Sequence, residues 1–240
     1  SDESRSQYTH NRIKDSNKDD NKCGACAPYR RLHLCDYNLE KMGRTSTTKH
    51  DLLAEVCMAA KYEGDSIKTH YTIHQQKYGD SQICTELARS FADIGDIIRG
   101  KDLYLGNPEE IKQREKLEEN LKTIFEKIYK DVTSGKKKEE ATKRYGSDTG
   151  DFFKLREDWW TANRATIWEA LTCDDDNRLA GAQYFRHTCG DEQGGAQAKD
   201  KCRCGDGDKS KAGNGDVNIV PTYFDYVPQY LRWFEEWAED

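Results

Sequence analysis

Nine cysteines constrain the fold of this 240-residue chain more than any other feature of its sequence. Only 35% of the residues are hydrophobic and 34% are charged, so the apolar core must be small for a protein of this length. Disulfides add about 2–4 kcal/mol each by restricting the unfolded chain, and they persist in oxidising compartments. The composition therefore favours a disulfide-supported extracellular domain over a cytosolic protein with scattered thiols. Because the count is odd, at least one cysteine has no partner within the chain.

Apolar residues recur at three- and four-residue steps in several stretches, which is the pattern of amphipathic helices. The clearest stripe, between residues 81 and 100, consists of Ile83, Leu87, Phe91, Ile94 and Ile98. Asn107 and Pro108 form a strong start signal for a further helix that runs to about Asp131. Other helices are expected from Thr48, over 66–78, over 151–173 and from about Val227.

The segments between these helices lack the periodicity. Residues 1–47 are polar and hold three closely spaced cysteines, 134–150 has the composition of a linker, and 190–216 has that of an exposed loop. The sequence therefore predicts an all-α bundle of about four principal helices behind an irregular, disulfide-stapled N-terminal lobe. Seven residues are expected in the bundle core: Phe91, Ile94, Ile98, Leu121, Ile128, Trp168 and Leu171.

The expected helix over 151–173 carries two adjacent tryptophans, Trp159 and Trp160. Adjacent side chains on a helix point in different directions, so the two cannot both face inward. One of them is therefore expected to be partly exposed or held at a boundary between helices, and an exposed one could anchor a binding partner. We assign the buried face of this helix to Leu155, Trp159, Ala162, Ile167, Trp168 and Leu171.

Three patterns resemble metal sites but are incomplete. The cysteines within 23–35 and within 189–204 lack the second pair that a structural zinc site requires. Residues 206–217 begin like a calcium loop but lack its turn glycine and its final glutamate. His70 and His74 have helical spacing without the glutamate of a metalloprotease motif. No metal, cofactor or catalytic site is therefore expected.

The net charge of −6 argues against a nucleic-acid-binding protein. Local charge is concentrated in a basic run at Lys136, Lys137 and Lys138 and in an acidic run over 174–176. Either run could steer a partner, although most such runs are solvated loops.

The ends of the chain suggest a piece of a longer protein. Residues 1–6 lack the apolar core of a signal peptide, and no run approaches the ~20 apolar residues that span a bilayer. The chain stops at Asp240 within an amphipathic pattern that has no stop signal. We therefore expect an excised, soluble piece that does not itself insert into a membrane.

Four stretches, in order along the chain, have a distinctive wording. They are Cys23-Gly-Ala-Cys-Ala-Pro-Tyr-Arg-Arg-Leu-His-Leu-Cys35, Ser81-Gln-Ile-Cys-Thr-Glu-Leu-Ala-Arg-Ser-Phe-Ala-Asp-Ile-Gly-Asp-Ile-Ile-Arg-Gly100, Asp158-Trp-Trp-Thr-Ala-Asn-Arg-Ala-Thr-Ile-Trp-Glu-Ala-Leu-Thr-Cys173 and Val220-Pro-Thr-Tyr-Phe-Asp-Tyr-Val-Pro-Gln-Tyr-Leu-Arg-Trp-Phe-Glu-Glu-Trp237. These stretches resemble the Duffy-binding-like adhesion domains of malaria parasites, in particular the alpha class of the Plasmodium falciparum erythrocyte membrane protein family. The resemblance extends over nearly everything from Cys23 to Asp240.

The resemblance implies two subdomains here, an irregular disulfide-stapled one over 1–65, truncated at its N-terminus, and a helical bundle over 66–240. A third subdomain of the family is absent from this chain. The resemblance further implies an extracellular adhesin and no enzyme, part of a membrane-anchored variant surface antigen on the infected erythrocyte. Its expected partners are host receptors of red cells or endothelium, namely sulfated or red-cell glycans such as heparan sulfate, or a host glycoprotein, in rosetting-type adhesion.

An alternative is a secreted helical scaffold or inhibitor whose disulfide-rich loops bind one specific host protein. Salt dependence separates the two hypotheses, because glycan binding weakens steeply with salt and apolar binding to one protein does not.

Cysteine spacing suggests two bridges in the N-terminal lobe. Cys26 and Cys35 are close enough to close a local loop. Cys23 is then expected to reach Cys57 in the first regular helix, with a cysteine from upstream of this chain as the competing partner.

Two more bridges are expected in the bundle. Cys84 opens one helix and Cys173 closes another, so they meet if the helices lie side by side in opposite directions. Of the remaining three cysteines, we pair Cys189 with Cys204, which leaves Cys202 unpaired in this chain.

Two groups of basic residues are candidates for binding sulfated glycans, whose strings of anions require clustered cations. Acidic neighbours at Glu139 and Glu140 interrupt the first group, so a solvated loop is the alternative. The first group is Lys136, Lys137, Lys138, Lys143 and Arg144, and the second is Lys112, Arg114 and Lys116.

Overall fold

The computed structural model describes residues 26–40, 49–75, 83–134, 138–148, 150–189, 195–198, 200–205 and 219–239, and these residues form the expected all-α fold. The helices are α1 (Tyr29–Leu32), α2 (Tyr37–Glu40), α3 (Lys49–Gln75), α4 (Ile83–Arg99), α5 (Pro108–Ser134), α6 (Lys138–Tyr145), α7 (Phe153–Leu171), the 3-10 helix η4 (Phe224–Tyr226) and α8 (Gln229–Glu239). Within the described residues, β-pairing is limited to two isolated bridges.

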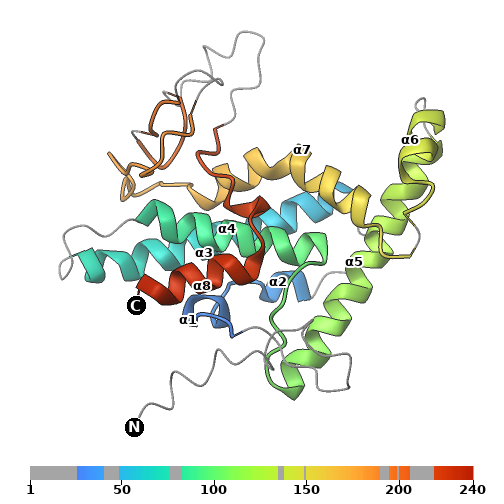
Figure 1. Ribbon diagram of the computed structural model, residues 1–240, viewed down its shortest axis with the longest axis horizontal. Helices are drawn as coiled ribbons and strands as arrows, with labels where there is room; N and C mark the ends of the chain where they lie inside the picture. The colour runs from blue at the N-terminus through green and yellow to red at the C-terminus, as the bar shows by residue number, and fades with distance from the viewer. Residues whose placement is uncertain are drawn as a thin grey trace.

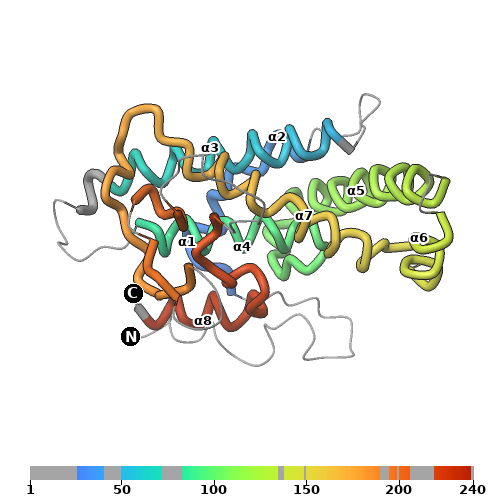
Figure 2. The backbone as a smooth tube through the Cα atoms, turned by 90° about the horizontal axis from the view of Figure 1, so that it is seen from above, coloured from blue at the N-terminus to red at the C-terminus, as the bar shows by residue number. Residues whose placement is uncertain are grey.

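Helices α3, α4, α7 and α8 lie along the long axis of the molecule, and α5 crosses their far end and carries α6 (Figures 1 and 2). Helix α4 occupies the centre, where it contacts α3, α7 and α8. All of its residues except Glu86 are buried. The strong apolar stripe of 83–98 therefore marks the helix around which the others pack.

The core contains all seven of the residues expected there, each at most 4% exposed. The ring of Phe91 lies edge-on to Trp168, with ring centroids 5.1 Å apart, and 5.0 Å from Trp160. Asn107 caps α5 as expected, because its Oδ1 accepts hydrogen bonds from the N–H groups of Glu109 and Glu110.

The expectation that the adjacent tryptophans cannot both face inward is wrong, because Trp159 and Trp160 are 8% and 0% exposed. The alternative expectation, a tryptophan held at a boundary between helices, is confirmed. Helix α7 is covered on two sides: Trp159 packs edge-on against Phe125 of α5, while Trp160 packs against α4 and donates to Asp225 of η4 at 2.9 Å. The two rings thus point in different directions, and both directions are inward. Ala162, assigned to the buried face, is exposed.

Two helical segments also differ from the sequence expectation. The stretch 66–75 is not a separate helix but continues α3, which starts at Lys49 as expected. Gly64 allows this continuous helix to touch α7, since a Cβ there would lie 2.0 Å from the carbonyl oxygen of Leu171. The supposed linker 134–150 contains α6, which packs on α5.

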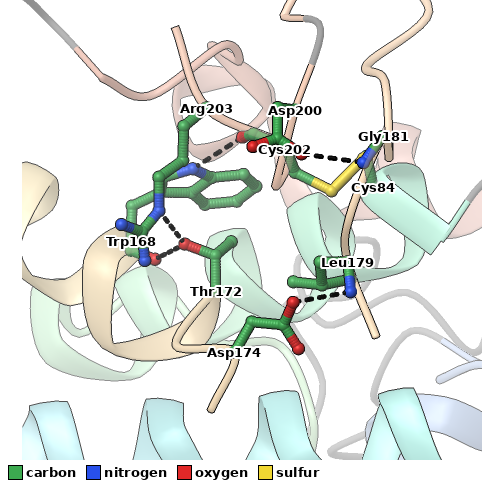
Figure 3. Close-up of a disulfide and its surroundings, with 9 residues drawn as sticks. All are labelled: Cys84, Trp168, Thr172, Asp174, Leu179, Gly181, Asp200, Cys202 and Arg203. Atoms are coloured by element: carbon green, nitrogen blue, oxygen red, sulfur yellow. Dashed lines mark hydrogen bonds between the residues drawn. A yellow bond between two sulfur atoms is a disulfide. The ribbon is translucent and has the colours of Figure 1, made fainter. Parts of the chain in front are cut away.

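The disulfides correct the expected pairing of Cys84. Helix α4 does begin beside the end of α7, but Cys84 bonds to Cys202 and not to Cys173 (Figure 3). Cys202 lies between the two helix ends, where its carbonyl accepts a hydrogen bond from Trp168 at 3.0 Å. The expected Cys84–Cys173 bridge and the unpaired Cys202 are therefore both wrong. The second bond joins Cys189 to Cys204, the pairing that the sequence favours.

The bridges expected in the N-terminal lobe are not formed. Cys35, Cys57 and Cys173 carry free thiols, and Cys23 lies outside the described residues. Cys35 lies beside Glu63, whose carboxylate accepts a hydrogen bond from the backbone N–H of Cys35 at 3.0 Å, and burial raises the pKa of the Cys35 thiol to about 12.

The described parts of 190–216 are also not an exposed loop, since Ala198, Cys202 and Cys204 are buried.

Buried ion pairs join the first and last described segments to α4. Asp93, which is fully buried, accepts hydrogen bonds from Arg30 of α1 at 2.7 Å and from Arg232 of α8 at 2.8 Å. Gln229 and Trp233 of α8 donate to the same carboxylate. Although burial opposes ionisation, these cationic neighbours hold the pKa of Asp93 well below its usual range.

Replacing Trp168 by Ala should lower the free energy of unfolding by about 3–5 kcal/mol, because the fully buried ring leaves a large cavity. Chemical denaturation measures the loss. The matched control is Met58→Ala on α3, where the side chain is 45% exposed and the loss should stay below about 0.5 kcal/mol. An unchanged melt for Trp168→Ala would contradict the assigned core.

The two disulfides should stabilise the chain unequally. Cys84–Cys202 spans a sequence separation of 118 and Cys189–Cys204 one of 15. Chain entropy then predicts that replacing Cys84 and Cys202 by Ala costs about 2 kcal/mol more than replacing Cys189 and Cys204. Denaturation of the two double variants tests this difference, and non-reducing peptide mapping that joins Cys84 to Cys173 would refute the assignment.

Acid should weaken the attachment of α1 and α8 to α4. A carboxylate whose pKa is depressed in the folded state stabilises it above the unfolded-state value, and that contribution is lost as the pH falls below about 4. Asp93→Asn should therefore be less stable than the unmodified chain at neutral pH and lose less stability on acidification. The measurement is the free energy of unfolding of both proteins from neutral pH to below about pH 4. If the two stability curves stay parallel over this range, the assignment is contradicted.

Candidate functional site

The first basic group is only partly available for binding. Lys138 and Lys143 of α6 are exposed, whereas Lys136 and Lys137 lie outside the described residues. Arg144 makes two hydrogen bonds to Asp158 of α7, one of them at 2.5 Å, and Tyr145 donates to the same carboxylate at 2.6 Å. The hydrogen bonds from Arg144 lower the pKa of Asp158. Arg144 therefore attaches α6 to α7, with its side chain still 61% exposed.

The second group is reduced in the same way. Arg114 is only 17% exposed, because it is bound to Asp102 and lies 3.6 Å from Asp36. Its guanidinium also lies over the ring of Tyr104, 5.0 Å from the ring centre. Lys112 and Lys116 remain exposed on α5. Two of the eight candidates, both arginines, thus serve the fold.

The structure does not bring the two basic groups together. Lys112 and Lys116 lie near the start of α5, and α6 lies at its far end (Figure 1). At 1.5 Å per residue, Lys116 and Ser134 are separated by about 27 Å along the helix. A single glycan-binding cluster made of both groups is therefore excluded for a short ligand.

Lys112 and Lys116 instead edge an open groove of about 1190 Å³. Its walls come from the end of α4, the loop 100–105, the first half of α5 and the start of α7. Apolar side chains contribute much of the lining: Ile97, Leu105, Ile111, Leu117, Leu121 and Phe153. Sequence reasoning missed this groove because four separate segments form it. The half-exposed Phe153 beside a helix start is its one local signal.

Tyrosine and aliphatic side chains, and not tryptophan, form an exposed apolar surface on η4 and α8. Tyr223, Val227, Tyr230 and Leu231 are 39–53% exposed. A smaller hollow of about 260 Å³ adjoins them, with Arg186 and Glu235 among its lining residues. The apolar residues of 223–231 therefore contribute to the surface as well as to the core.

No three His, Cys, Asp or Glu side chains are grouped to hold a metal ion in the parts of the chain that the structure describes. Cys189, Cys202 and Cys204 are used in disulfides, and the calcium-like segment 206–217 lies outside the described residues. Of the described helices, none combines the length and apolar character needed to cross a bilayer.

Comparison with known proteins connects this architecture to parasite proteins. The chain is 25% identical over 225 residues to the Duffy receptor beta form of Plasmodium knowlesi, a match that covers 90% of this chain and 14% of the receptor. It therefore spans only a small part of that relative.

Solved structures extend the similarity to the fold. The NTS-DBL1(alpha-1) domain of Plasmodium falciparum membrane protein 1 (PfEMP1) from the varO strain is 44% identical, with a TM-score of 0.66 over 92% of this chain and 45% of that one. A DBLβ domain of PfEMP1 bound to human ICAM-1 is 30% identical, with a TM-score of 0.59 over 88% of this chain and 39% of that one.

The described helical framework and these similarities agree with the match of a family model. The model for the Duffy binding domain matches residues 24–232, which is most of the sequence. The chain belongs to the Duffy binding domain family.

Proposed function

We propose that this chain is the receptor-binding part of a larger, membrane-anchored adhesin on the surface of the infected erythrocyte. The observation that carries the proposal is its 44% identity, over 92% of its length, to a PfEMP1 domain. The proposed role is binding and not catalysis, in keeping with the family name. The partner is a receptor on host red cells or endothelium.

We propose the same division of the chain that the sequence suggested. Residues 1–65 form the first subdomain and 66–240 the second, while a third subdomain lies outside this chain. Helix α3 continues through position 65, so the two subdomains share it. This sharing supports a rigid junction between them.

Two partner classes fit the described surface. Sulfated or red-cell glycans would use the lysines that remain exposed, namely Lys112, Lys116, Lys138 and Lys143, in rosetting-type adhesion. A host protein is supported by the DBLβ relative, whose structure contains human ICAM-1. The alternative function is a secreted scaffold that binds one specific host protein. It has the same class of partner, a host protein, but is not part of an adhesin.

Changing Lys136, Lys137 and Lys138 together to Ala should weaken heparin binding at low salt and leave the thermal melt unchanged. The reason is that lysine binds sulfate through its charge, which salt screens, and that Lys138, the described member of the group, is exposed. Retention on a heparin column and binding to human red cells, each measured at about 0.05 M and about 0.5 M salt, test the glycan class.

A triple variant of scattered lysines provides the control, since Lys61→Ala, Lys101→Ala and Lys127→Ala change the net charge equally. If both triple variants lose the same affinity, only net charge matters. If neither loses affinity, the basic run of Lys136, Lys137 and Lys138 is not the site. Red-cell binding that resists salt would favour the protein class.

A further inference from the structure

We infer that the groove beside α5 is a docking site for an amphipathic helix of a host protein, an inference that rests on the proposed receptor binding. Its residues on α5 run from Ile111 to Lys122. Eleven helical steps span about 16 Å, which matches about three turns of a partner helix lying alongside. A volume of about 1190 Å³ is far larger than a single side chain fills.

The apolar lining selects against a glycan. Phe153 is 45% exposed at one end of the groove, and Leu105 and Ile111 are partly exposed within it. Apolar side chains of a partner would gain by leaving water against this surface. Sulfate groups would find no hydrogen-bond donor on these apolar side chains, and glutamates accompany the lysines Lys112 and Lys116 at the edge of the groove. The recognition chemistry is therefore that of an apolar stripe.

The rim carries charges of both signs in equal number. Lys112, Glu115, Lys116 and Glu119 follow one another along the exposed side of α5, and among the described residues none of them forms an ion pair. The net charge of these four side chains is zero, so they do not attract a polyanion. A helix that carries glutamate and lysine on both sides of its apolar stripe is complementary to this order.

The other charged groups of the groove are already engaged. Lys122 is paired with Asp151 at 2.6 Å, and Glu118 with Arg156 at 2.6 Å. Arg114 is bound to Asp102. The four rim residues are thus the charges of the groove that remain for a partner.

The groove is preformed, which lowers the ordering cost of binding. The backbone N–H of Leu103 donates to Gln229 at 2.6 Å, and the hydroxyl of Tyr104 donates to Glu110 at 2.9 Å. Arg31 and Arg114 both lie within 5.0 Å of the centre of the Tyr104 ring. These contacts fix the loop 100–105 that forms one wall.

An extended strand is a poorer occupant than a helix. Strand addition requires unpaired backbone groups at a sheet edge. The α5 and α7 walls are helical, with backbone groups that bond within the helix. Side chains alone line the α5 side of the groove, and these recognise a helix through its apolar stripe.

Charge reversal distinguishes a helix from a polyanion by the sign of its effect. The probe is human red cells, with binding of the labelled chain measured by flow cytometry. For a mixed-charge helix, Glu115→Lys with Glu119→Lys and Lys112→Glu with Lys116→Glu should each weaken binding roughly tenfold, because either change creates like-charge contacts. For a polyanion, the first pair would strengthen binding and the second weaken it, and that result would overturn the inference.

Apolar variants test the floor of the groove. Ile111→Asp with Phe153→Asp should reduce red-cell binding at least roughly tenfold. Both positions lie in first helical turns, where an acidic residue suits the helix dipole, so folding should be preserved. The control is Met58→Asp, since Met58 is as exposed as Phe153 but lies on α3. Equal binding by all forms, or binding removed by heparinase and not by trypsin treatment of the cells, would overturn the inference.

A synthetic peptide makes the test independent of the receptor. An amphipathic peptide of about 15 residues, with leucines at helical spacing between alternating glutamates and lysines, should bind the unmodified chain and lose at least tenfold in affinity with the Ile111→Asp, Phe153→Asp variant. Absence of peptide binding would overturn the inference. Peptide binding without red-cell binding by any form would support the groove and count against the proposed red-cell receptor.

Discussion

The carboxylate of Asp93 is the constraint on which the arrangement of this chain depends. It lies fully buried on the central helix α4, and a buried charge is stable only when partners replace its hydration. Those partners come from both ends of the described chain, Arg30 of α1 and Arg232 of α8. Removing one partner of a buried pair costs about 3–5 kcal/mol, so the three helices must dock together. The fold is therefore held by polar contacts at a place where most helical bundles use apolar ones.

Arginines repeat this solution at the boundaries between other helices. Arg156 of α7 donates to the carbonyl groups of Ile97 and Ile98 at the end of α4 and to Glu118 of α5. Arg164 of α7 holds Asp225 of η4 in the same way. One planar side chain with five donors can satisfy a helix end and a carboxylate at once. The Arg156 clamp joins α5 to α4 and α7, and thereby helps to fix the shape of the groove.

What could be predicted from the sequence follows from how far each signal reaches along the chain. Local signals identified α4 and the start of α5. The buried stripe of Phe91, Ile94 and Ile98 is visible within one segment, and the cap formed by Asn107 lies beside the helix it starts. The partner of Cys84 was not predictable, since a loop more than a hundred residues away inserts Cys202 between two helix ends. The burial of both Trp159 and Trp160 depends on packing partners from three other elements. The groove, formed by four segments, was hidden for the same reason.

The division of labour between arginine and lysine explains why counting basic residues overestimates the anion-binding surface. Buried carboxylates select arginine, whose planar fork is matched to them, whereas lysine is strongly hydrated and stays at the surface. Arg114 follows this rule, because it is bound to the buried carboxylate of Asp102, and Arg144 binds Asp158 of another segment nearer the surface. The lysines that remain on α5 alternate with glutamates, so their long-range field largely cancels. On this part of the surface, recognition must come from shape and apolar contact, with charge selecting the register of the partner.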